Sequence, residues 1–271
     1  MTVADEENTV PFEQKGAEGI RLDRPPTAEE LTAWKLTYFG NRLCPFAHRT
    51  WFAMHEKGVT GDFGQYVHVE LGEKKPVWYK DKVNPFGTVP CIYEGTRGVF
   101  ESAVCVEYLD EKFAGRGTPL FPGDAVTRAA VRALVSSLDV KPLYAFLMEQ
   151  DRSKDETHKA ALATFMAAIE AKYTAQSADG PYFLGAELSA ADIALFPFID
   201  RMQPALLEYR GYDLWGGDTT PYPHLKAAWD AVQSRPGWIA TRQSADYYVA
   251  VYQGYATGKP GTVPLRIKAK G

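Results

Sequence analysis

The stretch Asn41–Arg49, NRLCPFAHR, marks the point where a strand-like run gives way to a helix-like one. Residues 36–39, just ahead of it, form a short apolar and β-prone run that ends at a glycine. Pro45 suits the first position of a helix, and Gly58 is a natural stop for that helix. A single cysteine, Cys44, therefore stands at the junction between strand and helix.

The position of Cys44 favours a reactive thiol. A helix begins with unpaired backbone N–H groups and the positive end of its dipole, and both stabilise a thiolate. We therefore expect the pKa of Cys44 to fall from about 8.5 toward neutral. Arg42, His48 and Arg49 are near enough in sequence to add to the field. The alternative is burial, because a lone cysteine is more often a small apolar core group.

Cys44 has no neighbouring thiol with which to form an internal disulfide. Position 47, three residues on, is alanine, which closes a dithiol mechanism between neighbouring sulfurs. A mixed disulfide on Cys44 would then have to be resolved by an external thiol. The abundant small thiol of the cell is glutathione. Cys91 and Cys105 are interpreted as core residues.

The composition bounds the class of protein. The chain has 271 residues, enough for two ordinary domains, of which 45% are hydrophobic and 24% charged. A net charge of -4 offers no electrostatic case for nucleic acid, and no run approaches the roughly 20 apolar residues of a membrane span. The acidic start does not resemble a signal peptide, and three cysteines suit neither a disulfide scaffold nor a metal site. We expect a cytoplasmic protein with reduced thiols.

The hydrophobic pattern divides the chain into five segments. Residues 1–34 are interpreted as an N-terminal extension. Residues 35–113 follow the order strand, helix, strand, strand, strand, helix, which predicts a compact α/β unit with a parallel pair and a hairpin. The Gly- and Pro-rich residues 114–124 are typical of a linker. Residues 125–250 predict an all-helical domain, and 251–271 a tail.

Two capping signals and a helical period refine this division. Thr27 with Glu30, and Ser189 with Asp192, have the spacing of a capping box, so each pair predicts a helix start with a structural role. The helices expected in the second half span about 125–151, 155–176, 190–209 and 223–234, with shorter pieces near 236–250.

Three motifs together resemble the cysteine-containing glutathione transferases. They are CPFA after a strand, NPFGTVP at 84–90, and ESA at 101–103 leading into EYLDE at 107–111. The omega class is the most similar and the lambda class is near it, over about residues 35–245. The resemblance implies an α/β plus all-α fold, with a thioredoxin-like N-terminal domain followed by a helical glutathione-transferase C-terminal domain.

The resemblance also implies a glutathione site around Cys44. The bond between Val89 and Pro90 resembles the family's cis bond, which would leave the Val89 backbone free to pair with the cysteinyl part of glutathione. Glu101 and Ser102, at a helix start, would hold the γ-glutamyl group. The plainer interpretation of Pro90 is an ordinary trans proline at the edge of the sheet. The plainer interpretation of Glu101 and Ser102 is a helix cap.

Further contacts are implied by the same resemblance. Lys75 resembles the residue that meets the glycyl carboxylate, although it could be a solvated charge, and Phe46 would line the floor beside the sulfur. Second-substrate contacts are expected from aromatic residues of the helical domain, for each of which core packing is an equal alternative: Tyr144 and Trp238, with Tyr247 and Tyr248 behind them.

A cysteine at position 44, where other transferases use Tyr or Ser, favours reduction through a mixed disulfide. The resemblance therefore implies a glutathione-dependent thiol transferase or reductase, with glutathione as co-substrate, a small electrophilic or disulfide substrate, and no metal. We expect a homodimer, with a monomer as the alternative. Two other functions stay open: a reductase of aromatic glutathione conjugates (hydroquinone- or ketone-like), and a non-catalytic binder of hydrophobic ligands. A cysteine protease using Cys44 and His48 is the weakest interpretation.

Overall fold

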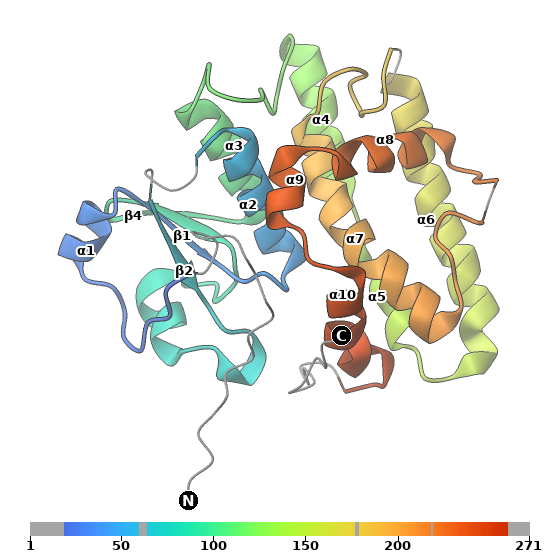
Figure 1. The fold of residues 1–271 in the computed structure, drawn as a ribbon, viewed down its shortest axis with the longest axis horizontal. Coiled ribbons are helices and arrows are strands. Elements are labelled where there is room, and N and C mark those ends of the chain that lie inside the picture. Colours follow the sequence, from blue (N-terminus) through green and yellow to red (C-terminus); the bar gives the residue numbers. More distant parts are fainter. Residues whose placement is uncertain (1–18, 60–63, 177–178, 218, 260–271) are drawn as a thin grey trace, which may run out of the picture.

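Residues 19–59, 64–176, 179–217 and 219–259 are described by the computed structural model, and they form two parts that lie side by side (Figure 1). The N-terminal part is built on a four-stranded sheet, and the C-terminal part is made of helices. This arrangement confirms the α/β plus all-α fold that the sequence predicts.

The sheet has the strand order β2-β1-β3-β4. Strands β1 (Leu36–Gly40) and β2 (Gly64–His68) are parallel, and β3 (Cys91–Glu94) is antiparallel to both β1 and β4 (Arg97–Phe100). A parallel pair needs a crossover connection, and α2 (Pro45–Glu56) supplies it. The predicted parallel pair and hairpin are both present.

Short helical elements surround the strands. The capping box predicted at Thr27 and Glu30 is present and starts α1. Helix α2 ends where the sequence predicts, since Gly58 follows its C-cap with a φ of +63°, a conformation that glycine adopts without strain. The remaining elements of this part are α1 (Ala28–Ala33), η1 (Gly72–Lys74), a π-helical turn η2 (Tyr79–Val83) and α3 (Ser102–Lys112).

The sheet carries a hydrophobic core on each face. Because successive strand residues point to opposite faces, Phe39 and Tyr38 of β1 serve different cores. Phe39 packs with Cys91 and Tyr79 in a small cluster confined to the N-terminal part. Tyr38 and Ile92 belong to a larger cluster that continues into the helical part. The two parts therefore share one core.

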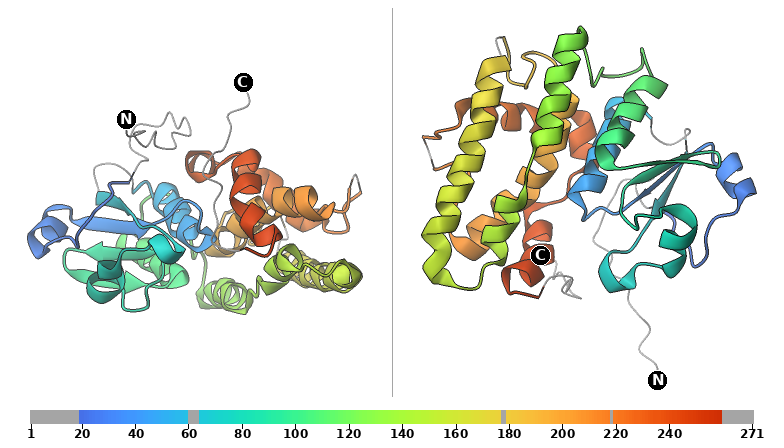
Figure 2. Two further views of the ribbon diagram at one scale, coloured as in Figure 1. Left: turned by 90° about the horizontal axis from the view of Figure 1, so that it is seen from below. Right: turned by 180° about the vertical axis from the view of Figure 1, so that it is seen from behind.

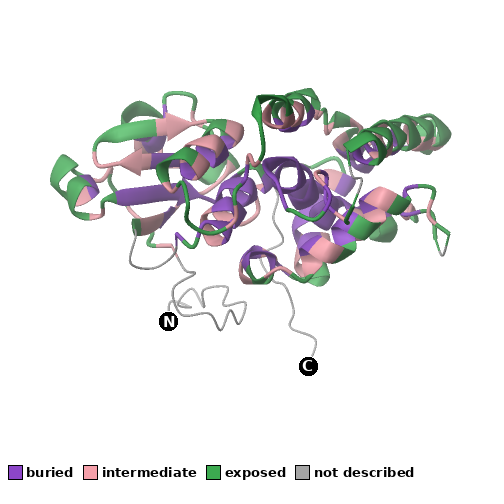
Figure 3. Ribbon diagram, turned by 90° about the horizontal axis from the view of Figure 1, so that it is seen from above, coloured by how far each residue is buried: buried purple, intermediate pink, exposed green. Residues whose placement is uncertain are grey.

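Helix α7 (Ala190–Arg210) is the centre of the C-terminal part. It is buried along most of its length (Figure 3), and α2 of the N-terminal part packs against both α7 and α9. Helix α6 lies at the edge farthest from the sheet (Figure 2). The helices of this part are α4 (Ala125–Ser137), α5 (Lys141–Met148), α6 (Asp155–Gln176), α7 (Ala190–Arg210), α8 (Pro223–Gln233), α9 (Pro236–Thr241) and α10 (Ala245–Ala256). None of the helices in the described ranges is both long and apolar enough to span a membrane.

One expected helix is in fact two. The sequence predicts a continuous helix over about 125–151, but Leu138 leaves the helical conformation with ψ at 95°. Asp139 then accepts a hydrogen bond from the backbone N–H of Lys141 at 3.1 Å, and Pro142 lies in the first turn of a new helix. A proline is well placed there because that position needs no N–H partner.

The helical part also extends past its expected end at residue 250. Helix α10 continues to Ala256, because side chains such as Tyr252 are buried against the rest of the domain. Residues 260–271 of the predicted tail lie outside the described residues, as do residues 1–18 of the predicted extension.

Buried ion pairs tie the end of α2 to the rest of the molecule. The Glu56 carboxylate accepts hydrogen bonds from Arg235 Nε at 3.0 Å and from Thr118 Oγ1 at 2.8 Å. The adjacent Lys57 donates to Asp110 of α3 at 2.9 Å. Since a buried charge is costly without partners, these contacts fix the linker and the helical domain against α2.

The second predicted capping box starts α7. Asp192 is completely buried, and its carboxylate accepts from the backbone N–H of Ser189 at 2.9 Å and of Phe183 at 3.0 Å, and from the Tyr173 hydroxyl at 3.0 Å. The Ser189 hydroxyl also donates to it at 3.0 Å. Four donors from three segments therefore converge on one side chain, and the structural role predicted for this pair fits that geometry.

Replacing this carboxylate should destabilise the protein strongly. Asp192→Ala leaves several buried donors without an acceptor, so we expect the free energy of unfolding to fall by about 3 kcal/mol. Asp124→Ala is the matched control, because Asp124 is an exposed cap that accepts from Thr127, and its loss should cost only about 1 kcal/mol. Urea unfolding followed by circular dichroism measures both. Equal losses for the two variants would contradict this account.

Candidate active site

Cys44 is the N-cap residue of α2. Its backbone is extended (φ −76°, ψ 118°), Pro45 takes the first helical position, and the side chain makes no capping hydrogen bond. The half-buried thiol Sγ lies 3.8 Å from the carbonyl oxygen of Val89. The thiol thus lies between the start of α2 and the segment that leads into β3, with no other cysteine bonded to it.

The peptide bond between Val89 and Pro90 is cis, as the resemblance implies. The carbonyl oxygen of Val89 is the atom that approaches Cys44 Sγ, so the structure brings Cys44, Val89 and Pro90 together. Of the remaining cysteines, Cys91 and Cys105 are both completely buried.

Glu101 and Ser102 lie at the start of α3. Glu101 is exposed and holds a φ of +67°, which is rare for a residue with a side chain. Ser102 is buried, and its hydroxyl accepts a hydrogen bond from Arg49 Nη1 at 3.2 Å. Arg49 also donates to the carbonyl of Ala194 on α7 at 2.8 Å. This arginine therefore connects α2, the start of α3 and the helical domain.

Phe46 and Lys75 complete the set of residues predicted to hold glutathione. The Phe46 ring is 42% exposed, lies 5.0 Å from the Phe198 ring and sits under the Arg49 guanidinium at 5.1 Å. Lys75 donates from Nζ to the carbonyl of Gly87, in the loop just ahead of the cis bond. Both residues thus lie close in the chain or in space to the segments that carry Cys44 and Val89.

The pKa of Cys44 is raised rather than lowered, which corrects the expectation from the sequence. Burial is the main cause and raises the pKa. The backbone N–H of Ala47, the charge of Arg201, the N–H of Phe46 and the charge of Arg49 oppose it, in that order. The helix start therefore acts in the predicted direction, but desolvation of the thiolate outweighs it.

Arg201 of α7 holds the loop ahead of Cys44, a role that the sequence pattern does not reveal. Its guanidinium is 1% exposed. It donates from Nε to the carbonyl of Leu43 at 2.9 Å and from Nη2 to the carbonyl of Arg42 at 2.8 Å. It also donates from Nη1 to Pro197 of its own helix at 2.8 Å. A cation on the helical domain thus positions the residues that immediately precede the thiol.

Three tyrosines of the helical domain lie near Cys44, and only one of them is predicted. The hydroxyl groups of Tyr144 on α5 and Tyr252 on α10 are 3.4 Å apart, and the Tyr255 ring lies 5.3 Å from the Tyr252 ring. Burial is the main cause that raises the pKa of each phenol, to about 12 for Tyr252, and a negative charge on Cys44 is a smaller cause in the same direction. All three phenols are therefore protonated at neutral pH and can donate hydrogen bonds.

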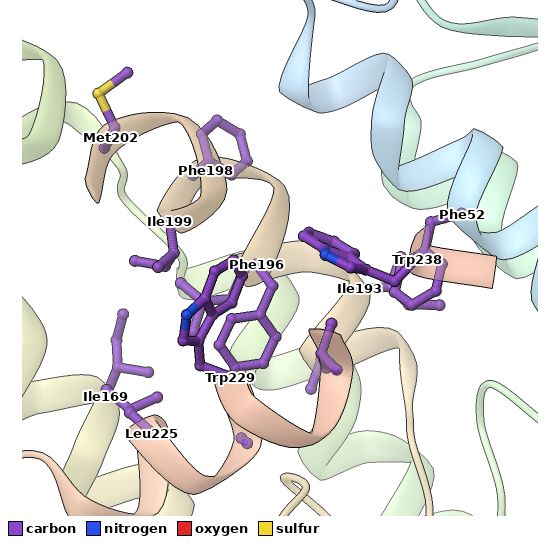
Figure 4. Close-up of a cluster of buried hydrophobic side chains, with 14 of the residues drawn as sticks. Phe52, Ile169, Ile193, Phe196, Phe198, Ile199, Met202, Leu225, Trp229 and Trp238 are labelled. Carbon is purple, nitrogen blue, oxygen red and sulfur yellow. The ribbon is translucent and has the colours of Figure 1, made fainter. Parts of the chain in front are cut away.

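Trp238 does not line a pocket. It is completely buried and packs between the two parts of the molecule, edge-on to Phe52 at 5.2 Å and to Trp229 at 5.7 Å (Figure 4). Its indole also stacks on the imidazole of His48 at 4.9 Å. The core-packing alternative therefore describes Trp238, and its buried ring offers no contact to a second substrate. Tyr248 is also completely buried.

A small cavity of about 10 Å³ lies behind the loop that precedes Cys44. Its walls include Asn41, Thr241 and Gln243. This is about the room of a single water, so the cavity is no substrate site. Across the described ranges, no cluster of three or more His, Cys, Asp or Glu could hold a metal ion.

Comparisons with known proteins show which family the chain resembles. Residues 43–112 match the family model described as "Glutathione S-transferase, N-terminal domain", and residues 140–240 match "Glutathione S-transferase, C-terminal domain". The chain is 32% identical to Glutathione S-transferase L3 of Arabidopsis thaliana over 231 residues, which is 84% of this chain and 90% of that protein. It is 31% identical to Glutathione S-transferase omega-1 of Sus scrofa over 169 residues, 61% of this chain and 66% of that protein.

A solved structure is similar over almost the same span. The structure of glutathione transferase Omega 3C from Trametes versicolor has a TM-score of 0.68 and 29% identity, and the match covers 84% of this chain and 93% of that one. Both the plant and the omega-class relatives thus extend over the two parts of the fold.

The backbone of Glu101 allows a test of its role. Glu101→Gly removes the side chain that makes a φ of +67° unfavourable. Relief of that strain, partly offset by the entropy of glycine, should raise the free energy of unfolding by about 1 kcal/mol. Glutathione affinity, measured by isothermal titration calorimetry, should fall because the carboxylate is gone.

Glu101→Ala is the matched control for this substitution. It removes the carboxylate but keeps a Cβ, so it should weaken glutathione binding without the gain in stability. If both variants bind glutathione as the wild type does, Glu101 has no part in the site.

Proposed function

The chain belongs to the glutathione S-transferase family, and on that premise we propose that it is a glutathione-dependent thiol transferase that reacts through a mixed disulfide on Cys44. The observation that carries this proposal is the half-buried thiol at the N-cap of α2, 3.8 Å from the Val89 carbonyl. The other two cysteines are completely buried and offer no internal partner.

The reaction has two exchange steps. In the first, the Cys44 thiolate attacks the glutathionyl sulfur of a mixed disulfide; a bond forms between the two sulfurs, and the substrate thiolate leaves and takes up a proton. In the second, the thiolate of a free glutathione attacks the glutathionyl sulfur on Cys44. Glutathione disulfide leaves, and Cys44 is again a thiolate. One free glutathione is thereby oxidised and joins the glutathionyl group of the substrate in one disulfide, and the substrate is reduced to its thiol.

Glutathione would lie along the segments that surround Cys44. The backbone at Val89 is next to the sulfur and would pair with the cysteinyl part. Glu101 and Ser102 at the start of α3 would take the γ-glutamyl group, and the Arg49 charge on the Ser102 hydroxyl favours a carboxylate there. Lys75 would meet the glycyl carboxylate.

Small disulfides are the substrates that this chemistry serves best. A dehydroascorbate-type compound would first bond to Cys44 Sγ through its carbonyl carbon; a glutathione thiolate would then attack that sulfur, the carbon–sulfur bond would break, and the reduced compound would leave with a proton and give the same mixed disulfide. A thiolate nucleophile forms a covalent bond to sulfur, whereas a tyrosine or serine hydroxyl would only stabilise the thiolate of glutathione. The proposal includes a homodimer in the cytoplasm, where reduced glutathione is available and the three free cysteines stay reduced.

A second candidate function is reduction of aromatic glutathione conjugates, and the tyrosines near Cys44 favour it. Attack of Cys44 on the conjugate's sulfur would break its carbon–sulfur bond, and the electron pair would pass to a ketone or ring oxygen of the leaving group. Protonated Tyr144 and Tyr252, with hydroxyls 3.4 Å apart, could donate hydrogen bonds to that oxygen. The leaving group then takes up one proton.

The nucleophile is tested by Cys44→Ser. A serine hydroxyl is no thiolate and forms no disulfide, so reduction of a small glutathionyl mixed disulfide should fall at least about a thousandfold. The coupled oxidation of NADPH by glutathione reductase measures the rate.

Cys105→Ser is the control, since the Cys105 thiol donates to the Val99 carbonyl at 3.5 Å and a serine can do the same. It should retain the wild-type rate. Full activity of Cys44→Ser would exclude the proposed mechanism, and the absence of turnover in the wild type would favour a ligand-binding protein.

The second candidate is tested by Tyr252→Phe. Loss of one hydrogen-bond donor should lower kcat/KM for a phenacyl-type conjugate about tenfold, with little change for a small disulfide. Tyr222→Phe is the matched control, because its hydroxyl contacts Ala163 on α6, far from Cys44. An equal loss on both substrates would mean that Tyr252 acts only by packing.

A further inference from the structure

His48 is a buried histidine whose two ring nitrogens both have partners. It lies in the first turn of α2, one turn after Cys44. Its Nε2 is 2.8 Å from Thr241 Oγ1 on α9, and its Nδ1 is 3.1 Å from Arg201 Nη1 on α7. Three helices therefore meet at one imidazole.

The partners determine where the proton of the ring lies. A guanidinium has only donors, so Arg201 Nη1 donates and His48 Nδ1 must accept. The ring proton then lies on Nε2 and is donated to Thr241 Oγ1, whose own hydrogen is directed to the carbonyl of Gly237 at 2.8 Å. Burial, and then the charges of Arg201 and His55, hold the pKa of His48 well below its ordinary value. His48 is thus neutral, with one tautomer.

Among the described residues, no carboxylate forms an ion pair with Arg201. Its hydrogen bonds go to the carbonyls of Arg42, Leu43 and Pro197 and to the imidazole of His48. Within the parts of the chain that the structure covers, no carboxylate oxygen lies within 4.0 Å of this guanidinium. The neighbouring Asp200 carboxylate acts on it from a longer distance.

Other charged and titratable groups surround this cluster. The positive charges of Arg201 and Arg49 act on the Cys44 sulfur. The charges of Arg201 and His55 act on His48.

Four groups act electrostatically on Arg201. They are the carboxylate of Asp200 and the phenols of Tyr144, Tyr248 and Tyr252. The Tyr248 ring lies 4.7 Å from the guanidinium carbon. Arg201 Nε donates to the carbonyl of Leu43, the residue just before Cys44, at 2.9 Å, and its charge favours the thiolate of Cys44.

We propose that His48 is a positioning residue for Arg201. As a neutral hydrogen-bond acceptor, His48 orients the guanidinium group without cancelling its charge. That charge is then available as the counter-charge for the Cys44 thiolate. This inference rests on the proposed role of Cys44 as the nucleophile. A carboxylate at position 48 would make the same contact to Arg201 but would cancel its charge.

A purely structural role for His48 makes a different prediction. The imidazole stacks on Trp238 at 4.9 Å, so its loss could simply loosen the core between the two parts. Loosening of the core would lower the free energy of unfolding. Its effect on Cys44 would be the same whether the new side chain at position 48 is neutral or negative.

The test is the pH dependence of Cys44 alkylation by iodoacetamide in the full chain, followed by mass spectrometry of the peptide that contains Cys44. His48→Gln keeps an acceptor for Arg201 and a donor for Thr241, so the alkylation midpoint should stay within about 0.3 pH units of the wild type. His48→Glu should raise the midpoint by about one unit, which is a tenfold smaller thiolate fraction at neutral pH.

Two further variants make the result specific. Leu207→Glu adds a carboxylate to the exposed side of α7, six residues after Arg201, and should shift the midpoint by less than about 0.3 units, since an exposed charge is screened. Arg201→Gln removes the charge itself and should raise the midpoint as His48→Glu does, which keeps the test decisive if His48→Glu does not fold.

The outcomes separate this inference from the proposed function. A midpoint unchanged in Arg201→Gln, or raised equally by His48→Gln and His48→Glu, overturns the positioning role. Midpoints that shift as expected in a protein with no glutathione turnover would overturn the proposed function and leave the positioning role in place. Glutathione turnover in a protein whose alkylation midpoints do not shift would overturn the positioning role and leave the proposed function in place.

Discussion

The guanidinium of Arg201 fastens the loop ahead of Cys44 to the core of the helical domain. It donates to the carbonyls of both Arg42 and Leu43, while its own helix α7 is buried among the other helices. The thiol belongs to the N-terminal part, yet its position is set by a side chain of the C-terminal part. The two parts share one hydrophobic core across α2 and α7, so the candidate active site includes residues of both parts.

The electrostatics of Cys44 are a balance between burial and four favourable groups. Burial raises the pKa of the thiol, and two backbone N–H groups and two guanidinium groups lower it. A carboxylate in direct contact with Arg201 would change that balance, and none of the described residues makes such a contact. A neutral histidine as the partner of Arg201 leaves the charge of the guanidinium group in place. It also supplies a hydrogen-bond acceptor, which a buried cation needs even where it has no counter-ion.

Much of the fold is predicted by local signals in the sequence, and much of the site is not. The strand and helix around Cys44 and the capping box at Asp192 depend on neighbouring residues, so they could be predicted. The cis bond at Pro90 is implied by the family resemblance alone. Arg201 lies on a helix whose pattern indicates only core, and its role depends on contacts across 158 and 159 positions in the chain. The aromatic character of Trp238 suggests a pocket residue, but it does not reveal which side of a helix meets the core. The sign of the pKa shift of Cys44 depends on burial, and burial is a tertiary property.

The most direct test of the central claim is the mass of the protein after exposure to glutathione disulfide, with peptide mapping of the adduct. The account predicts one glutathionyl group per chain, located on Cys44 and removed by reduced glutathione. An unmodified Cys44, or a glutathionyl group there that reduced glutathione does not release, would contradict it.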